Sequence, residues 1–171
     1  MGDPRKKHKK FSRPRRAYDK IRIEDENVLA AKYGLKNKRE IWKADEAVKI
    51  IRGNAKKLIT AGEKEKEAFL ARLQKKGYNV KTIGEVLALN KEDLLKRRLQ
   101  TILVDKQLAR SSKEARQLIV HKHVSVSGNK VNIPSYTVNI EEENEIRVER
   151  PIINIKEKQE ENENTQEGET Q

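Results

Sequence analysis

The hydrophobic period changes once along this chain, and that change constrains the fold more than any other feature. Up to about residue 120 the apolar residues recur every three or four positions, as on one face of an amphipathic helix. From Val124 to Ile133 they alternate, on either side of Gly128-Asn129, which is a two-residue hairpin signal, and residues 146–148 supply a last short strand. We therefore expect an α+β protein in which helices precede a small antiparallel sheet.

Capping signals divide the amino-terminal part of the chain into separate helices. The segment 25–33 consists of helix-forming residues and stops at Gly34, which favours a short helix. Asn37 followed by Glu40 is a variant of the capping box, and the apolar residues after it recur at helical spacing as far as Ile59. We predict a long amphipathic helix there.

Further helices should follow before the period changes. The segment 63–76 carries an apolar stripe and stops at Gly77, so it should run antiparallel to the long helix. Thr82 and Asn90 each precede an acidic residue by three positions and should begin further helical segments. The chain should then stay helical to about Ala109.

A full Ser-x-x-Glu capping box, Ser111 with Glu114, begins the last helix before the change of period. Its buried stripe should consist of Ala115, Leu118 and Ile119. Lys113 and Arg116 are three positions apart and share another face, and Arg110 with the free N–H groups of the helix start would hold a phosphate. Basic helix faces also occur in ordinary soluble domains, so this face alone does not establish nucleic-acid binding.

Charge is distributed unevenly along the chain, which holds 39 Lys and Arg against 27 Asp and Glu, a formal net charge of +12. Residues 1–20 hold nine basic and two acidic residues and should form an extended basic arm. Residues 156–171 hold two Lys and six Glu with no apolar side chain, and should form a disordered acidic tail. Between them we predict a helical domain, residues 21–96, and a compact αα-β module, residues 97–155.

Several function classes are excluded by what the sequence lacks. With no cysteine, the chain forms no disulfide, thiolate zinc site or cysteine nucleophile. No two of its eight glycines are closer than seven residues, which excludes the dinucleotide fingerprint and the P-loop. Its longest apolar runs are four residues, and no secretory signal pattern follows the basic start. We expect a cytoplasmic protein with no catalytic residue, metal, cofactor, membrane contact or small-molecule substrate.

His121 and His123 are two positions apart and should share one face at the start of the first strand. A metal site or an acid–base pair would need further ligands or carboxylates, which the neighbouring sequence does not place there. Donation to phosphate and simple termination of the helix remain equal alternatives for the two side chains.

The segment 97–136 closely resembles the alpha-L RNA-binding module. The family pattern is matched at Arg98-Leu99, Ala109-Arg110-Ser111, Glu114–Ile119, Val124–Gly128 and Pro134-Ser135-Tyr136. The basic opening of the chain, the segment KYGLKNKREIW and the helical region before the module resemble the archaeal branch of the small-subunit ribosomal protein four family. Only the acidic tail lies outside the resemblance.

The resemblance implies a structural constituent of the small ribosomal subunit. Such a protein binds 16S-type ribosomal RNA directly in its 5′ domain, early in assembly, next to other small-subunit proteins, and contributes to translational accuracy. The implied RNA-binding residues of the module are Arg98, Arg110, Ser111, Lys113, Arg116, Gln117, His121, Lys122 and Lys130. The arm would add Arg5, Lys6, Lys7, Lys9, Lys10, Arg13, Arg15 and Arg16.

Three residues depart from the pattern of the module. Gln100 stands where many modules have Asp, and Ser127 stands where Asn is usual before the hairpin glycine. Lys122 stands where many modules have a helix-ending Gly, at a cost of about 1 kcal/mol if the backbone there is left-handed.

Two other function classes share features with this chain. The same module is appended to pseudouridine synthases and some tRNA synthetases, but the roughly 95 residues before it show neither a nucleotide loop nor an acid–base set. A free-standing RNA-binding stress protein or a DNA-binding structural protein would show little preference for ribosomal RNA. Competition binding distinguishes these classes from the ribosomal one.

Overall fold

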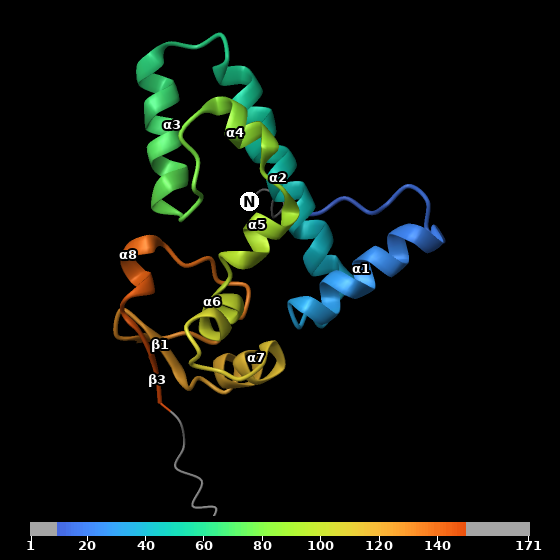
Figure 1. Ribbon diagram of the computed structural model, residues 1–171, viewed down its shortest axis with the longest axis vertical. Helices are drawn as coiled ribbons and strands as arrows, with labels where there is room; N and C mark the ends of the chain where they lie inside the picture. The colour runs from blue at the N-terminus through green and yellow to red at the C-terminus, as the bar shows by residue number, and fades with distance from the viewer. Residues whose placement is uncertain (1–9, 150–171) are drawn as a thin grey trace, which may run out of the picture.

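The computed structural model describes residues 10–149, which form an all-helical part followed by a mixed module (Figure 1). The helical part consists of α1 (Lys20–Lys32), α2 (Lys38–Leu58), α3 (Glu63–Lys75), α4 (Ile83–Ala88) and α5 (Lys91–Lys96). The module consists of α6 (Leu99–Asp105), α7 (Ser112–Val120), β1 (Val124–Val126), β2 (Asn129–Lys130), α8 (Ile140–Glu143) and β3 (Ile146–Val148). The predicted α+β class is confirmed. Residues 1–9 of the predicted arm and the whole predicted tail lie outside the described residues.

Side-chain caps begin the first two helices of the helical part. Asp19 caps α1 by accepting from the backbone N of Arg22, so the helix begins five residues earlier than predicted. Asn37 caps α2 as predicted, accepting from the backbone N of Arg39 at 2.9 Å. The carboxylate of Glu40 does not return to this cap, because it pairs with two arginines of the module.

The predicted continuous helix to Ala109 is wrong, because the chain pairs with a distant segment at residues 97–99. The backbone N of Leu99 donates to Tyr136 O at 2.8 Å, and the N of Val138 donates to Arg97 O at 3.1 Å. This pairing holds Arg98 in an extended conformation between α5 and α6. Tertiary backbone hydrogen bonds therefore override the local helix propensity.

The sheet is antiparallel with the order β2-β1-β3, so β1 lies in its centre. The hairpin turn is at Ser127-Gly128, where φ is +48° and +79°, and not at Gly128-Asn129 as predicted. Two successive residues with positive φ are typical of a type I′ turn, which lets Asn129 pair with Val126. The second predicted run ends early, since β2 ends at Lys130 and Ile133 is 55% exposed.

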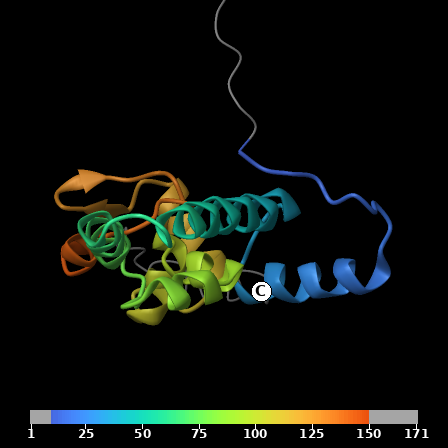
Figure 2. The same cartoon turned by 90° about the horizontal axis from the view of Figure 1, so that it is seen from above.

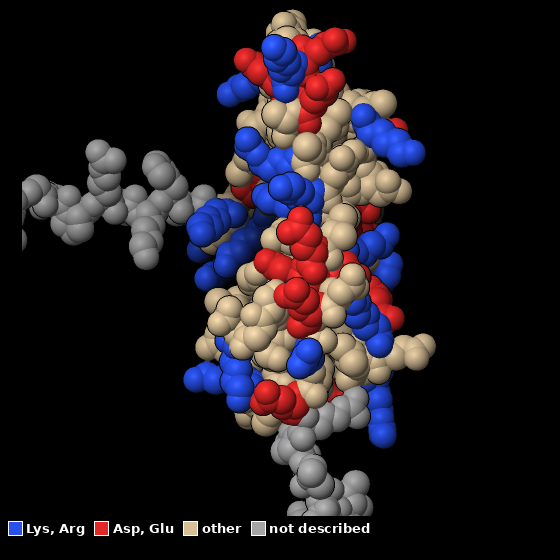
Figure 3. Space-filling view, turned by 90° about the vertical axis from the view of Figure 1, so that its left-hand side faces the viewer, with Lys and Arg blue, Asp and Glu red and all other residues tan. Residues whose placement is uncertain are grey.

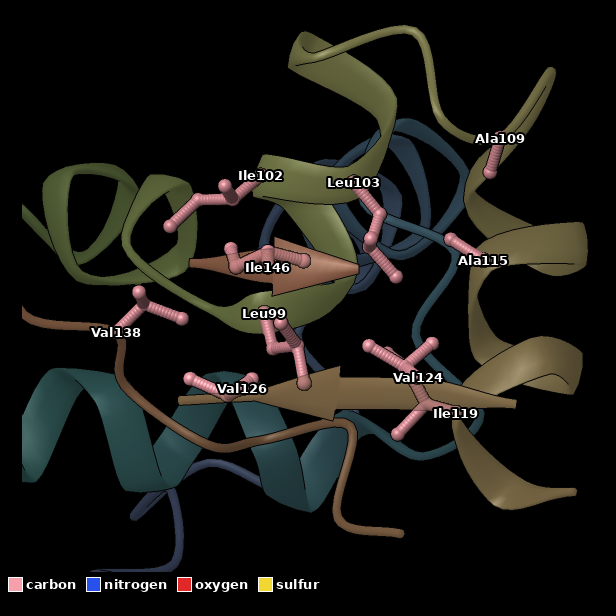
Figure 4. Packing of buried hydrophobic residues seen from close by; sticks show 10 residues of the cluster. All are labelled: Leu99, Ile102, Leu103, Ala109, Ala115, Ile119, Val124, Val126, Val138 and Ile146. Carbon is pink, nitrogen blue, oxygen red and sulfur yellow. The ribbon is translucent and has the colours of Figure 1, made fainter. Parts of the chain in front are cut away.

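The core of the module joins α6 and α7 to the sheet (Figure 4). Leu99 and Leu103 of α6, Ile119 of α7 and Val124 of β1 are fully buried and pack in one cluster with Ile146 of β3. This cluster fixes α7 against the sheet and so determines which side of that helix faces solvent.

Two smaller clusters stabilise the helical part. One lies between α2, α3 and α4 and includes Ala55, Leu73 and Val86, which agrees with the predicted return of α3 alongside α2. The other joins α1, α2 and α5 through Leu29, Ile41 and Leu95. Figures 1 and 2 both show α1 projecting away from the remaining helices. None of the described helices is long and apolar enough to cross a membrane.

Candidate nucleic-acid interface

The cap of α7 fixes the start of the candidate interface. The hydroxyl of Ser111 accepts from the backbone N of Glu114 at 3.2 Å, and the Glu114 carboxylate accepts from the backbone N of Arg110 at 2.7 Å. Ala115 and Ile119 are fully buried, as predicted. The helix therefore presents its opposite side to solvent.

The solvent side of α7 is basic and polar. Lys113, Gln117 and His121 follow each other at intervals of four residues, share one stripe, and are all exposed. Arg110 before the helix and Lys122 after it are also exposed. In the described part of the chain, no carboxylate lies within ion-pair distance of the side chains of Arg110, Lys113 or Lys122.

Lys122 occupies a left-handed backbone conformation, with φ of +63°. This position ends α7 in the way that a glycine usually does, and it turns the chain into β1. The unusual conformation places a further cation beside the α7 stripe.

Lys130 is the last residue of β2, just after the hairpin turn, and its side chain forms an ion pair with Glu149 at 3.1 Å. The two side chains are 60% and 63% exposed, so water screens their attraction strongly. A phosphate can replace Glu149 at little cost.

Arg98 and Arg116 differ from the other predicted residues, because the structure places both in an internal ion-pair cluster. Both guanidinium groups donate to the carboxylate of Glu40, at 2.5 Å from Arg98 and 3.0 Å from Arg116. Arg98 is buried and Arg116 is half-buried. The ion pairs of these two arginines with Glu40 therefore join α2 to the module.

Burial by itself raises the pKa of the Glu40 carboxyl, but the hydrogen bonds from Arg116 and Arg98 outweigh burial and hold this pKa below its ordinary value. Glu40 is therefore ionised at neutral pH and available to both arginines. The sequence indicates only a helix cap at this position, because the two partners lie more than fifty residues away.

Gln100 makes the second connection between the two parts of the molecule. Its side-chain N donates to three backbone oxygens, those of Tyr33 at 3.1 Å, Gly34 at 3.0 Å and Ser112 at 2.8 Å. A carboxylate in its place could not donate to these oxygens. This geometry explains why Gln is present where many related modules have Asp.

The described end of the basic arm lies on α2. Phe11 stacks on Trp42 with ring centroids 6.3 Å apart, and the guanidinium of Arg39 lies 5.2 Å from the Phe11 ring centroid. The exposed cations of this segment are Lys10, Arg13, Arg15 and Arg16. The other predicted arm residues, Arg5, Lys6, Lys7 and Lys9, lie outside the described residues.

The His121 and His123 rings stack with centroids 6.2 Å apart. Within residues 10–149 no group of three or more His, Asp or Glu side chains is arranged to hold a metal ion. His121 caps the carboxyl end of α7, since its backbone N donates to Gln117 O at 3.0 Å.

The face of the molecule that carries α3 and α8 differs in charge from the solvent side of α7 (Figure 3). Acidic side chains gather in its middle, at the height of α8, and basic side chains surround them. Glu141 and Glu145 are exposed in this region. Since carboxylates repel phosphate, the basic side of α7, on the other side of the module in Figure 1, is the better candidate for binding nucleic acid.

Comparison with known proteins finds a family match in the module and relatives that cover most of the chain. Residues 97–144 match the S4 domain. The small ribosomal subunit protein uS4 of Thermoplasma acidophilum is 41% identical over 167 residues, which cover 90% of this chain and 83% of that protein. The chain belongs to the uS4 family.

Two further uS4 proteins show that the likeness extends beyond the S4 domain. The protein from Methanococcus aeolicus is 44% identical over 153 residues, which cover 85% of this chain and 86% of the relative. The protein from Saccharolobus islandicus is 42% identical, covering 84% and 83%. These uS4 proteins are named as ribosomal proteins, and the chain is not one of the enzymes that carry a similar module.

Proposed function

We propose that this uS4 protein is a structural constituent of the small ribosomal subunit that binds small-subunit ribosomal RNA directly through the exposed side of α7. The supporting observation is the stripe of Lys113, Gln117 and His121, flanked by Arg110 and Lys122, with no acidic partner for its cations in the described chain. The matching S4 domain and the names of the relatives support the same proposal.

The interface suits double-helical RNA. Such RNA hides its base edges in a deep, narrow groove, so proteins recognise it mainly by shape and through phosphates. The chain has 39 Lys and Arg but an aromatic content of only 4%, which favours phosphate contacts over base stacking. Lys130 and the exposed arginines of the arm would add further phosphate contacts to those of α7.

The finer parts of the proposal follow from the family resemblance. We place the binding site in the 5′ domain of 16S-type RNA and place binding early in assembly, with neighbouring ribosomal proteins as partners and a contribution to translational accuracy. The protein would work in the cytoplasm as part of the small subunit. The boundaries 1–20, 21–96, 97–155 and 156–171 remain our proposed domain division.

Binding across a salt series tests the function. The full chain is titrated against a fragment of the 5′ domain, with unrelated structured RNA and duplex DNA as competitors. We expect tight binding to the fragment at physiological salt while competitor binding collapses, since counterion release dominates non-specific binding. Equal binding to all three nucleic acids, fading together with salt, would contradict the ribosomal proposal.

A matched pair of variants tests the surface. Lys113→Ala removes an exposed cation of the α7 stripe, and Lys64→Ala removes an exposed cation from α3. We expect Lys113→Ala to weaken binding to the fragment by roughly tenfold and to lower the salt slope by about one, with little effect from Lys64→Ala. Equal effects of the two variants would show that α7 is not the binding face.

A further inference from the structure

The described end of the basic arm is attached to the helical part at two points. In Figures 1 and 2 this dark blue segment leaves α2 and crosses to the outer end of α1. We call residues 11–17 the strap. Its first end is the ring of Phe11, and its second end is formed by the backbone carbonyls of Arg16 and Ala17.

An aromatic contact attaches the first end of the strap to α2. Phe11 is half-buried, and its ring stacks on that of Trp42 with the centroids 6.3 Å apart. The guanidinium of Arg39, three residues before Trp42, lies 5.2 Å from the centroid of the Phe11 ring. A cation beside an aromatic ring adds attraction to the area that the rings bury. The nearby Tyr18 is 95% exposed, and among the described residues its ring stacks on no other.

Arg22 of α1 holds the second end of the strap. Its Nη2 donates to Arg16 O at 3.0 Å and to Ala17 O at 2.9 Å. Its Nη1 donates to Glu26 Oε1 at 2.7 Å, and Trp42 Nε1 donates to the same oxygen at 2.9 Å. Glu26 is only 4% exposed. One buried carboxylate therefore orients both groups that hold the strap, the indole on α2 and the guanidinium on α1.

The strap carries three arginines without an acidic partner. Arg13, Arg15 and Arg16 are exposed, and within residues 10–149 no carboxylate lies within ion-pair distance of their side chains. A segment that is disordered when free loses conformational entropy when it binds. A strap that is held at both ends has lost much of this entropy on folding, so its arginines can meet phosphates at a lower cost.

We propose that Phe11 is a positioning residue for RNA binding. Its contact with Trp42 holds the strap on the helical part before RNA arrives, and so fixes where the three strap arginines meet the backbone phosphates. The proposal rests on the proposed RNA-binding function and gives this part of the arm a preformed geometry. Phe11 acts through the arginines and contacts no RNA itself, and Glu26 acts one step further back by orienting Trp42 and Arg22.

The first test detects the held strap without RNA. Trp42 is the only tryptophan of the chain, so its indole N–H gives a single NMR signal. We expect Phe11→Ala to shift this signal and to lower the heteronuclear NOE of residues 12–16 to that of a mobile segment. Phe11→Tyr, which keeps the ring, and Tyr18→Ala, which removes an exposed ring, should stay close to the parent chain. Low NOE values in the parent chain, or unchanged values in Phe11→Ala, would overturn the proposal.

The second test is a double-mutant cycle in the full chain. We expect Phe11→Ala to weaken binding to the 5′-domain fragment by roughly tenfold, with little effect from Tyr18→Ala. The same substitution should have no further effect in a chain whose strap arginines are neutral, because the cations that Phe11 positions are then absent. That chain carries Arg13→Gln, Arg15→Gln and Arg16→Gln. An equal effect of Phe11→Ala in both chains would show a merely structural role and overturn the proposal.

The outcomes separate the positioning role from the function as a whole. If the parent chain selects the ribosomal fragment but Phe11→Ala binds it equally well, the positioning role is wrong and the proposed function stands. If the parent chain shows no preference for the fragment over the competitors, the proposed function fails, and the positioning role falls with it even where the NMR test finds the strap held.

Discussion

Lys122 shows how one residue serves both the fold and the proposed interface. Its backbone has a φ of +63°, where a lysine is less stable than a glycine, and its side chain is exposed beside α7. A glycine would end the helix equally well but would carry no charge. The chain therefore keeps a cation at this position at some cost in stability.

Replacing this lysine separates the two effects. We expect Lys122→Gly to raise the free energy of unfolding by up to about 1 kcal/mol, because glycine adopts positive φ without strain. The same variant should bind the RNA fragment more weakly, since one phosphate contact is lost. Denaturant unfolding and a binding titration measure the two quantities. A variant that is more stable and binds as tightly as the parent would place Lys122 outside the interface.

Glu40 is the residue on which the ion-pair cluster depends. Glu40→Gln removes the charge that balances Arg98 and Arg116, and it leaves both guanidinium groups partly buried without a counter-charge. We expect a loss of about 2–4 kcal/mol in the free energy of unfolding. Glu67→Gln on the exposed side of α3 is the matched control and should change this free energy by less than about 0.5 kcal/mol.

The same carboxyl makes the stability of the protein depend on pH. Because the folded pKa of Glu40 lies below its ordinary value of 4.5, its contribution is fully present above that value and is lost as pH falls through the folded pKa. We expect the stability difference between the parent chain and Glu40→Gln to be constant near neutral pH and to shrink below about pH 4.5. A difference independent of pH down to acid unfolding would mean that the ion pairs contribute nothing.

At the scale of elements, local signals in the sequence predict most helix bounds but not an interruption that a distant segment causes. Asn37, Thr82, Asn90 and Ser111 are caps that the sequence indicates, because a cap acts within three residues of itself. The break at Arg98 depends on hydrogen bonds to residues 136–138, and no local pattern contains that information. The predicted hairpin turn lies one residue too late in the chain for a related reason. The pairing of β1 with β3 fixes the position of β1 and thus the position of the turn that follows it.

A substitution at the hairpin turn between β1 and β2 should increase the stability of the protein. Ser127 has a φ of +48° and precedes Gly128, and Asn adopts this conformation more easily than Ser does. We expect Ser127→Asn to raise the free energy of unfolding by about 0.5 kcal/mol and Ser127→Ala to lower it by a similar amount. Thermal unfolding of the three proteins checks the order. The reverse order would show that the turn is not of type I′.

At the scale of the whole molecule, the sequence predicts the exposed part of the candidate interface but not the connection beneath it. Lys113 follows from helical spacing together with the buried side of the same helix, and Gln117 follows from the family resemblance. The pairing of Glu40 with Arg98 and Arg116 joins segments that are distant in sequence, so spacing cannot indicate it.

The contact between the helical part and the S4 domain is tight at Gly34. This residue has a φ of +58°, and a Cβ built on it would lie 2.6 Å from the Cβ of Ser112 and 2.9 Å from the side-chain N of Gln100. An alanine there would strain the backbone and push the two parts of the molecule apart. Gly53, in the middle of α2, has no such neighbour within 4 Å.

These two glycines give a matched test of the connection. We expect Gly34→Ala to lower the free energy of unfolding by at least about 2 kcal/mol, because strain adds to the lost contact. Gly53→Ala should raise it by about 0.5–1 kcal/mol, since alanine stabilises a helix interior. If the connection also shapes the RNA surface, Gly34→Ala should weaken binding to the 5′-domain fragment under conditions where it is still folded, and Gly53→Ala should not. Equal affinities of the two folded variants would show that the helical part and the S4 domain bind RNA independently.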